Sequence, residues 1–174
     1  MKKHERGLTL LEMTVSLTVF SVVILIVFQT FTIGSRTLEI ASTQSKIVGG
    51  ARKGIDMMNH ELRNSSYSQI ITATNGLLEF RLPEINNDET SPTFGDIEDW
   101  SELIHYRLDE NNDQLIRVDD NDGTTTVIAN HVQTFIPNKG AETLTIDMTT
   151  QGETVYGTDL DPIALRSTVE FRNQ

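Results

Sequence analysis

The apolar positions of this 174-residue chain change period once, near residue 66. Between Met13 and Ser35 there are 23 residues without a charged side chain, and a helix of about 20 apolar residues crosses the hydrocarbon core of a bilayer. From Thr37 to Asn64 the apolar residues recur every three or four positions, which is the period of one helix face. Because no proline precedes Pro83, the pattern predicts one continuous helix from about Leu8 to about Ser65, roughly 58 residues and roughly 87 Å long.

Beyond residue 66, apolar and polar residues alternate, which is the period of a half-buried strand. The dipeptide Asn75-Gly76 joins the first two such stretches and is a strong hairpin signal. The expected strands are Gln69–Thr74, Leu77–Leu82, Leu103–Leu108, Gln114–Val118, Thr125–Ala129, Val132–Ile136, Glu142–Thr149 and Ile163–Phe171. Short strands joined by tight turns predict an antiparallel sheet. The expected fold class is therefore α+β: a long N-terminal α-helical spine, half membrane-spanning and half amphipathic, packed on a C-terminal antiparallel β-sheet.

Two stretches depart from these regular patterns. Gly49, Gly50 and Gly54 each weaken a helix by up to about 1 kcal/mol relative to alanine, so they mark either a bend or close packing against the sheet. The stretch 83–99 carries six acidic residues and no basic one, with Glu102 just beyond it. We expect an acidic loop over 83–102 whose carboxylates are solvated, with docking of a partner as the alternative.

The N-terminal residues predict the orientation of the apolar run in the membrane, and they include one acid that is unfavourable in a bilayer. Lys2, Lys3 and Arg6 precede the run, which predicts a cytoplasmic N-terminus and a C-terminal part across the membrane. Glu12 is the one acid in the apolar run that begins at Leu8. A carboxylate deep in a bilayer costs about 2.5–3.5 kcal/mol on insertion scales, and less near the interface. Such an acid therefore needs a partner.

The sequence Gly7-Leu8-Thr9-Leu10-Leu11-Glu12 resembles the processing signal of the type IV pilin superfamily. Leu8 stands where phenylalanine is commonest, a departure that the family tolerates. The resemblance implies cleavage by prepilin peptidase between Gly7 and Leu8, and methylation of the new amino group of Leu8. It also assigns Glu12 and Thr9 to assembly, with Glu12 paired to the N-terminus of a neighbouring subunit. Two unit charges about 4 Å apart attract by roughly 4 kcal/mol at an effective dielectric of about 20, enough to retain the acid.

Further along, the chain is similar to minor subunits of the W type, found in type IV pili, and of the J type, found in type II secretion. The similarity rests first on Gly54–Asn64, where an aspartate and apolar residues precede Glu61-Leu62-Arg63. Looser matches follow at 103–109, 115–117, 127–132 and 165–169. We expect Glu61 and Arg63 to be solvated at the end of an amphipathic helix. The chain has no cysteine for the C-terminal disulfide loop of many major pilins, which also favours a minor subunit.

The resemblance implies that the chain is a non-enzymatic structural subunit of the bacterial inner membrane. It divides the chain into four segments. These are a cleaved leader (1–7), a transmembrane and assembly helix (8–35), an amphipathic helix (36–66) and a periplasmic antiparallel β-sheet domain (67–174). Its expected partners are prepilin peptidase, other minor and major pilins or pseudopilins, the inner-membrane assembly platform and the lipid bilayer. The first interpretation is a type IV pilus minor pilin, at the tip and priming assembly. The alternative is a tip subunit of the type II secretion pseudopilus.

Charge and composition narrow the remaining chemistry. Without residues 1–7 the chain carries 11 basic and 24 acidic side chains, a net charge of −13. Nucleic-acid-binding surfaces are basic, so we expect no nucleic-acid partner. The absence of cysteine excludes thiolate metal sites and cysteine nucleophiles. The histidines (His4, His60, His105 and His131) show no metal-ligand spacing, and Ser65–Ser68 lacks a nucleophile elbow.

One weak metal pattern lies in the second half of the chain. Asp109, Asn111 and Asp113 occupy the first, third and fifth places of a calcium loop, and Asp120 occupies the twelfth. The sixth place holds Gln114 instead of glycine, and residues that favour turns explain the same cluster. No other cofactor is expected. Two further function classes stay open: a calcium-dependent periplasmic binding or adhesive domain on a pilin-type anchor, and a signal-anchored sensor or enzyme domain with an intact N-terminus.

Overall fold

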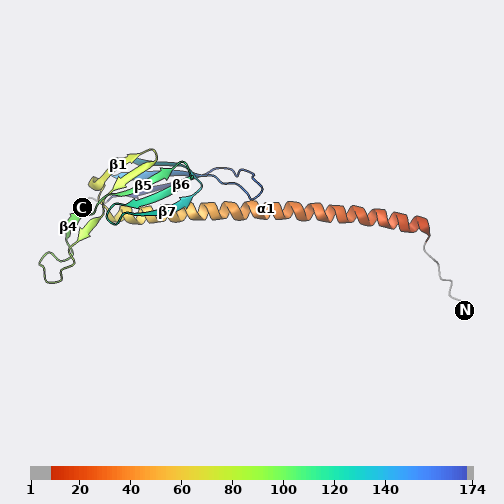
Figure 1. Cartoon of the computed structure of the whole chain (residues 1–174), viewed down its shortest axis with the longest axis horizontal. Helices are drawn as coiled ribbons and strands as arrows, with labels where there is room; N and C mark the ends of the chain where they lie inside the picture. Colours follow the sequence, from red (N-terminus) through yellow and green to blue (C-terminus); the bar gives the residue numbers. More distant parts are fainter. Residues whose placement is uncertain (1–8, 172–174) are drawn as a thin grey trace. The chain divides into compact units, whose positions relative to one another are not determined.

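A single long helix begins the fold. The computed structural model describes residues 9–171 as two compact units, one ending at Ser42 and the other beginning at Thr43. Helix α1 (Leu10–Asn64, 55 residues) belongs to both units (Figure 1). The predicted continuous helix is therefore confirmed, with ends within two residues of those expected.

Antiparallel strands follow the helix, so the predicted α+β fold class is confirmed. After a short 3-10 helix, η1 (Tyr67–Gln69), the strands are β1 (Ile70–Thr74), β2 (Leu77–Phe80), β3 (Pro83–Ile85), β4 (Ile97–Trp100), β5 (Ile104–Asp109), β6 (Gln114–Asp119), β7 (Thr124–Asn130), β8 (Val132–Lys139), β9 (Thr143–Thr150) and β10 (Ile163–Glu170). They form a five-stranded sheet in the order β1-β2-β5-β6-β7 and a three-stranded sheet in the order β10-β9-β8. A single sheet was expected, and the described residues instead contain these two sheets and a separate β3-β4 ribbon.

The prediction of a loop over 83–99 is partly wrong. Its two ends pair as β3 and β4, with Glu84 opposite Asp99 and Ile85 opposite Ile97. The strands are only three and four residues long, and the register shifts between Glu84 and Ile85. Two such short strands with a bulge between them show no alternation long enough to detect in the sequence.

The core lies between the inner face of α1 and the two larger sheets. The helix contributes Ile47, Ala51, Ile55, Met58 and Leu62, all buried. The last four of these pack in one cluster with side chains from both sheets, including Phe80, Tyr106, Phe135, Ile146 and Val169. Each fully buried large apolar side chain stabilises the fold by about 1.5–3 kcal/mol. The apolar stripe predicted between residues 37 and 64 is thus the inner face of the helix from Ile47 onward.

The three glycines in the second half of α1 differ in their surroundings. A β-carbon on Gly54 would lie 2.8 Å from Ile128 Cγ2, so this glycine allows close packing of α1 against β7. Gly49 and Gly50 are exposed, and β-carbons there would meet nothing within 4 Å. Close packing therefore explains Gly54 alone.

The expectation that Glu61 is solvated is wrong. Its carboxylate accepts hydrogen bonds from Arg117 Nε at 3.0 Å and from the Tyr106 hydroxyl at 2.8 Å. Arg117 Nη2 also contacts Asp119 at 2.9 Å. The side chains of Glu61 and Arg117 are only 14% and 12% exposed. Glu61 lies at the margin of the buried helix face, where Arg117 on β6 determines whether the carboxylate is solvated. The spacing of apolar residues along the helix does not reveal this partner, so the prediction failed. Arg63 is exposed, as expected.

Candidate processing and assembly site

The first turn of α1 brings the two predicted assembly residues together. The backbone N–H of Glu12 donates to Thr9 Oγ1 at 3.2 Å, and the backbone N–H of Thr9 donates to Glu12 Oε2 at 3.2 Å. The Thr9 hydroxyl also lies 3.4 Å from Glu12 Oε2. This reciprocal pair is a capping box, which satisfies two N–H groups that a helix start otherwise leaves without partners.

The capping box gives Glu12 a partner within its own chain. An acidic side chain in the first turn is further favoured by about 0.3–1 kcal/mol, because the N-terminus of a helix carries partial positive charge. Within residues 9–171, the hydrogen bonds of the Glu12 side chain all go to Oε2. Oε1 therefore remains available to a cation from outside the described chain. This local bond was not predicted from the sequence, although the spacing Thr-x-x-Glu before an apolar run signals it.

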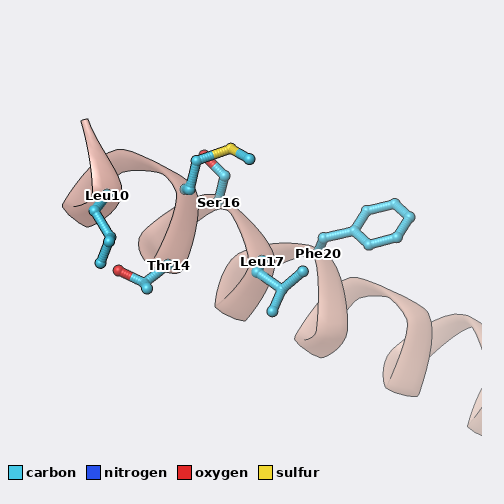
Figure 2. A pocket seen from close by; sticks show the side chains of 6 residues that line it. Leu10, Thr14, Ser16, Leu17 and Phe20 are labelled. Atoms are coloured by element: carbon cyan, nitrogen blue, oxygen red, sulfur yellow. The ribbon is translucent and has the colours of Figure 1, made fainter. Parts of the chain in front are cut away.

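The helix beyond Glu12 presents apolar side chains all round. Each large apolar side chain from Leu10 to Ile33 is at least 50% exposed, including Leu11 at 73% and Phe28 at 67%. Figure 2 shows side chains near the start of this segment projecting from α1, and all the residues that border this open apolar surface come from α1 itself. The lining residues are Leu10, Met13, Thr14, Ser16, Leu17 and Phe20. Such a surface is stable only against lipid or against other apolar helices.

Most hydroxyl residues of this segment donate a hydrogen bond within the helix. Thr14, Thr18 and Ser21 each donate to a backbone carbonyl three or four residues earlier, at 2.8–2.9 Å. Thr30 and Thr32 do the same at 2.9 Å. These bonds remove the cost of placing a hydroxyl in a hydrocarbon environment. In the part of the chain that the structure describes, α1 is the helix long and apolar enough to cross a membrane.

The remaining predicted site residues are the cleavage-point residues and the calcium candidates. Gly7 and Leu8, which flank the predicted cleavage point, lie outside the described residues. Asp109 accepts hydrogen bonds from Asn111 N and Asn112 Nδ2 in the β5–β6 turn. The bond from Asn112 lowers the pKa of Asp109 below its usual range.

The four calcium candidates do not share one loop. Asp109, Asn111 and Asp113 lie in or beside the turn before β6, whereas Asp120 follows the end of β6. A six-residue strand separates the two ends by roughly 20 Å. No group of three His, Cys, Asp or Glu side chains among residues 9–171 has the geometry to hold a metal ion. The turn interactions account for Asp109 without a metal.

Asp120 instead belongs to a cluster on the outer face of the five-stranded sheet. His105 Nδ1 lies 2.9 Å from Glu79 Oε1, and His105 Nε2 lies 2.7 Å from Asp120 Oδ2. The Thr72 hydroxyl bonds to the other oxygen of Glu79. Burial lowers the pKa of His105, but its hydrogen bonds to the carboxylates of Asp120 and Glu79 outweigh burial, so the pKa is raised. Both ring nitrogens face carboxylates, an arrangement that favours the imidazolium form.

Comparison with known protein families bears on the N-terminal segment. Residues 2–28 match the prokaryotic N-terminal methylation motif. This segment is a prepilin signal of the type IV pilin-like kind. The match includes the predicted cleavage point and the Thr9–Glu12 capping box. Neither a curated protein nor a solved structure matches the chain. The signal together with the long apolar helix supports the pilin-like superfamily and is compatible with membrane anchoring.

Proposed function

We propose that this chain is a minor pilin or minor pseudopilin, a structural subunit that assembles through its N-terminal helix. The observation that carries the proposal is the methylation motif at residues 2–28, followed by a helix whose apolar side chains are exposed on every side. A subunit of a helical bundle requires that surface, because neighbouring copies or lipid must cover it. Its function would be assembly, without catalytic turnover.

In this proposal prepilin peptidase removes residues 1–7 and methylates the amino group of Leu8. Residues 8–35 span the inner membrane and later join the filament core, residues 36–66 form the amphipathic half of the spine, and residues 67–174 form the periplasmic domain. Glu12 pairs through Oε1 with the N-terminal ammonium of a neighbouring pilin, while Thr9 holds Oε2. The remaining partners are the assembly platform and other minor and major subunits.

A position at the tip of a type IV pilus, where minor pilins prime assembly, is our first choice of filament. The resemblance of Gly54–Asn64 to W-type minor subunits supports it. The same residues resemble J-type subunits, so a type II secretion pseudopilus tip is the second candidate. The two candidates can be distinguished by deleting the assembly genes of one system at a time and measuring whether this chain is still incorporated into a filament. Incorporation should be lost only when the genes of its own system are deleted.

The decisive experiment is the intact mass and N-terminal sequence of the chain recovered from membranes that contain an active prepilin peptidase. We expect a chain that starts at Leu8 with one added methyl group. Gly7→Val serves as the uncleaved control, and Glu12→Gln should be cleaved but incorporated poorly into filaments. A wild-type chain that still starts at Met1 under these conditions contradicts the proposal.

A further inference from the structure

Charge is segregated between the helix and the sheets in the unit that begins at Thr43. From residue 65 to residue 171 the chain carries five basic and 20 acidic side chains. The outer face of α1 in this unit has the opposite sign, with Lys46, Arg52, Lys53 and Arg63 exposed and one exposed acid, Asp56. Complementary patches of this kind guide association and set its orientation.

The outer helix face also has a gap in its side-chain cover. Gly49 lies near the centre of this face, and a β-carbon there would meet nothing within 4 Å. The neighbouring Gly50 also has open space around it, but it lies at the edge of this face and lines a hollow with Asn112 and His131 of the sheet side. Each glycine costs about 1 kcal/mol relative to alanine in a helix, and no contact within the described chain explains the pair. Between Lys46 and Lys53 the helix backbone is therefore accessible to an approaching chain.

The β3-β4 ribbon has the complementary properties. Its register places Ile85 and Ile97 on one face, together with Pro83 and Trp100, and places Glu84 and Asp99 on the other. Ile85 and Ile97 remain 51% and 47% exposed. The connecting segment adds Phe94, which is 55% exposed. In Figure 1 the ribbon projects from the two larger sheets.

The tip of the ribbon is held in shape by its own hydrogen bonds. Asn86 N donates to Asp96 O at 2.9 Å, and Gly95 N donates to Asn86 O at 3.0 Å. The Asn86 side chain bonds to Ser91 and Thr93 at 3.2 and 3.0 Å. A partner therefore meets a preformed surface, which lowers the ordering cost of binding.

We propose that the acidic β3-β4 ribbon of one copy docks on the basic outer helix face of a second copy of this chain. Carboxylates at the ribbon would face Arg52 and Lys53, and an apolar side chain of the ribbon would pack over Gly49. The two surfaces differ, so the contact is heterologous: the copy that supplies the ribbon keeps a free helix face, and the copy that supplies the helix face keeps a free ribbon. This inference rests on the proposed assembly function and names a partner within it.

The test measures proximity between the two surfaces in full-length chains purified from membranes in a neutral detergent at low salt. The chain contains no cysteine, so Gly49→Cys in one chain and Phe94→Cys in another can be joined by a short bis-maleimide without background. We expect a cross-linked dimer. Replacing Phe94→Cys with Ala164→Cys, on the exposed side of β10, is the matched control and should give no dimer above background.

Charge reversal then tests the chemistry of the contact. Arg52→Glu/Lys53→Glu in the Gly49→Cys chain should lower the dimer yield about tenfold, because two rim attractions become repulsions. Glu84→Lys/Asp99→Lys in the Phe94→Cys chain should do the same. Combining the two reversed chains restores attraction and should restore the yield.

Three outcomes would overturn the proposal: no selective dimer, reversals without effect, or two reversals that fail to compensate. If the helix reversal lowers the yield and the ribbon reversal does not, the helix face binds another anion, such as lipid headgroups, and the proposal is wrong. The N-terminal mass is measured on the same samples. A chain cleaved at Leu8 that gives no dimer refutes this inference alone, whereas an uncleaved chain refutes the proposed function.

Discussion

Removing the guanidinium of Arg117 should strongly destabilise the sheet domain. In Arg117→Leu, the Glu61 carboxylate loses its 3.0 Å partner and Asp119 loses a 2.9 Å partner. Glu61 stays mostly out of water, with a side chain that is 14% exposed in the native chain. Breaking a fully buried pair from one side costs about 3–5 kcal/mol, and the residual exposure here lowers the expected loss to about 2–4 kcal/mol.

A second arginine in the same fold provides the control. Arg166 contacts Asp147 through a similar pair, but the two side chains are 73% and 36% exposed. Such surface pairs contribute about 0–1 kcal/mol, so Arg166→Leu should change stability little. Glu61→Leu/Arg117→Leu should recover part of the loss, because no charge is left stranded under the helix.

Urea unfolding of the full-length chain in detergent, followed by near-ultraviolet circular dichroism, measures these differences. All tyrosines and the one tryptophan lie beyond residue 65, so the tyrosine and tryptophan signal reports the sheet domain and not the apolar helix. Equal losses for Arg117→Leu and Arg166→Leu would refute the argument that burial sets the value of the Glu61–Arg117 pair.

Two further predictions concern the same domain. Gly54→Ala should lower the free energy of unfolding in urea by about 1–3 kcal/mol, because its β-carbon would lie 2.8 Å from Ile128 Cγ2. Gly49→Ala, with open space around it, should raise the free energy of unfolding by up to about 1 kcal/mol. The opposite order would contradict the packing described at β7. The raised pKa of His105 predicts a stabilising contribution that is complete below about pH 6.5 and is lost as pH rises through the folded pKa. Unfolding titrations between about pH 6 and about pH 8 should therefore show a steeper fall for the native chain than for His105→Gln, and parallel curves would contradict it.

Local signals in the sequence predicted the elements well. The uncharged run, the three-to-four spacing and the absence of proline were sufficient for α1, because each acts along one helix. Asn75-Gly76 located the first hairpin, and Gly76 has a φ of +79° as such turns require. The alternation at Ile163–Glu170 predicted β10 within one residue at its C-terminal end.

Interactions between distant segments could not be predicted in the same way. The pairing of β2 with β5 passes over the β3-β4 ribbon, so the order of strands along the chain did not reveal the division into sheets. The partners of Glu61 lie 45 and 56 residues away, at Tyr106 and Arg117. His105 likewise meets Glu79 and Asp120 only because β2, β5 and the β6–β7 turn come together. No regular spacing in the sequence indicates which distant residues form these contacts.

The capping box changes how Glu12 should be understood. From the sequence, the acid seemed to need a partner on another subunit, because its charge is costly inside an apolar helix. The structure shows that Thr9 already satisfies Oε2 within the same chain. A single subunit can therefore tolerate Glu12 near the helix start before any neighbour is present. Among residues 9–171, the bonds to Thr9 leave Oε1 unused. The pairing that we propose between Glu12 and a neighbouring ammonium therefore does not require the cap to break.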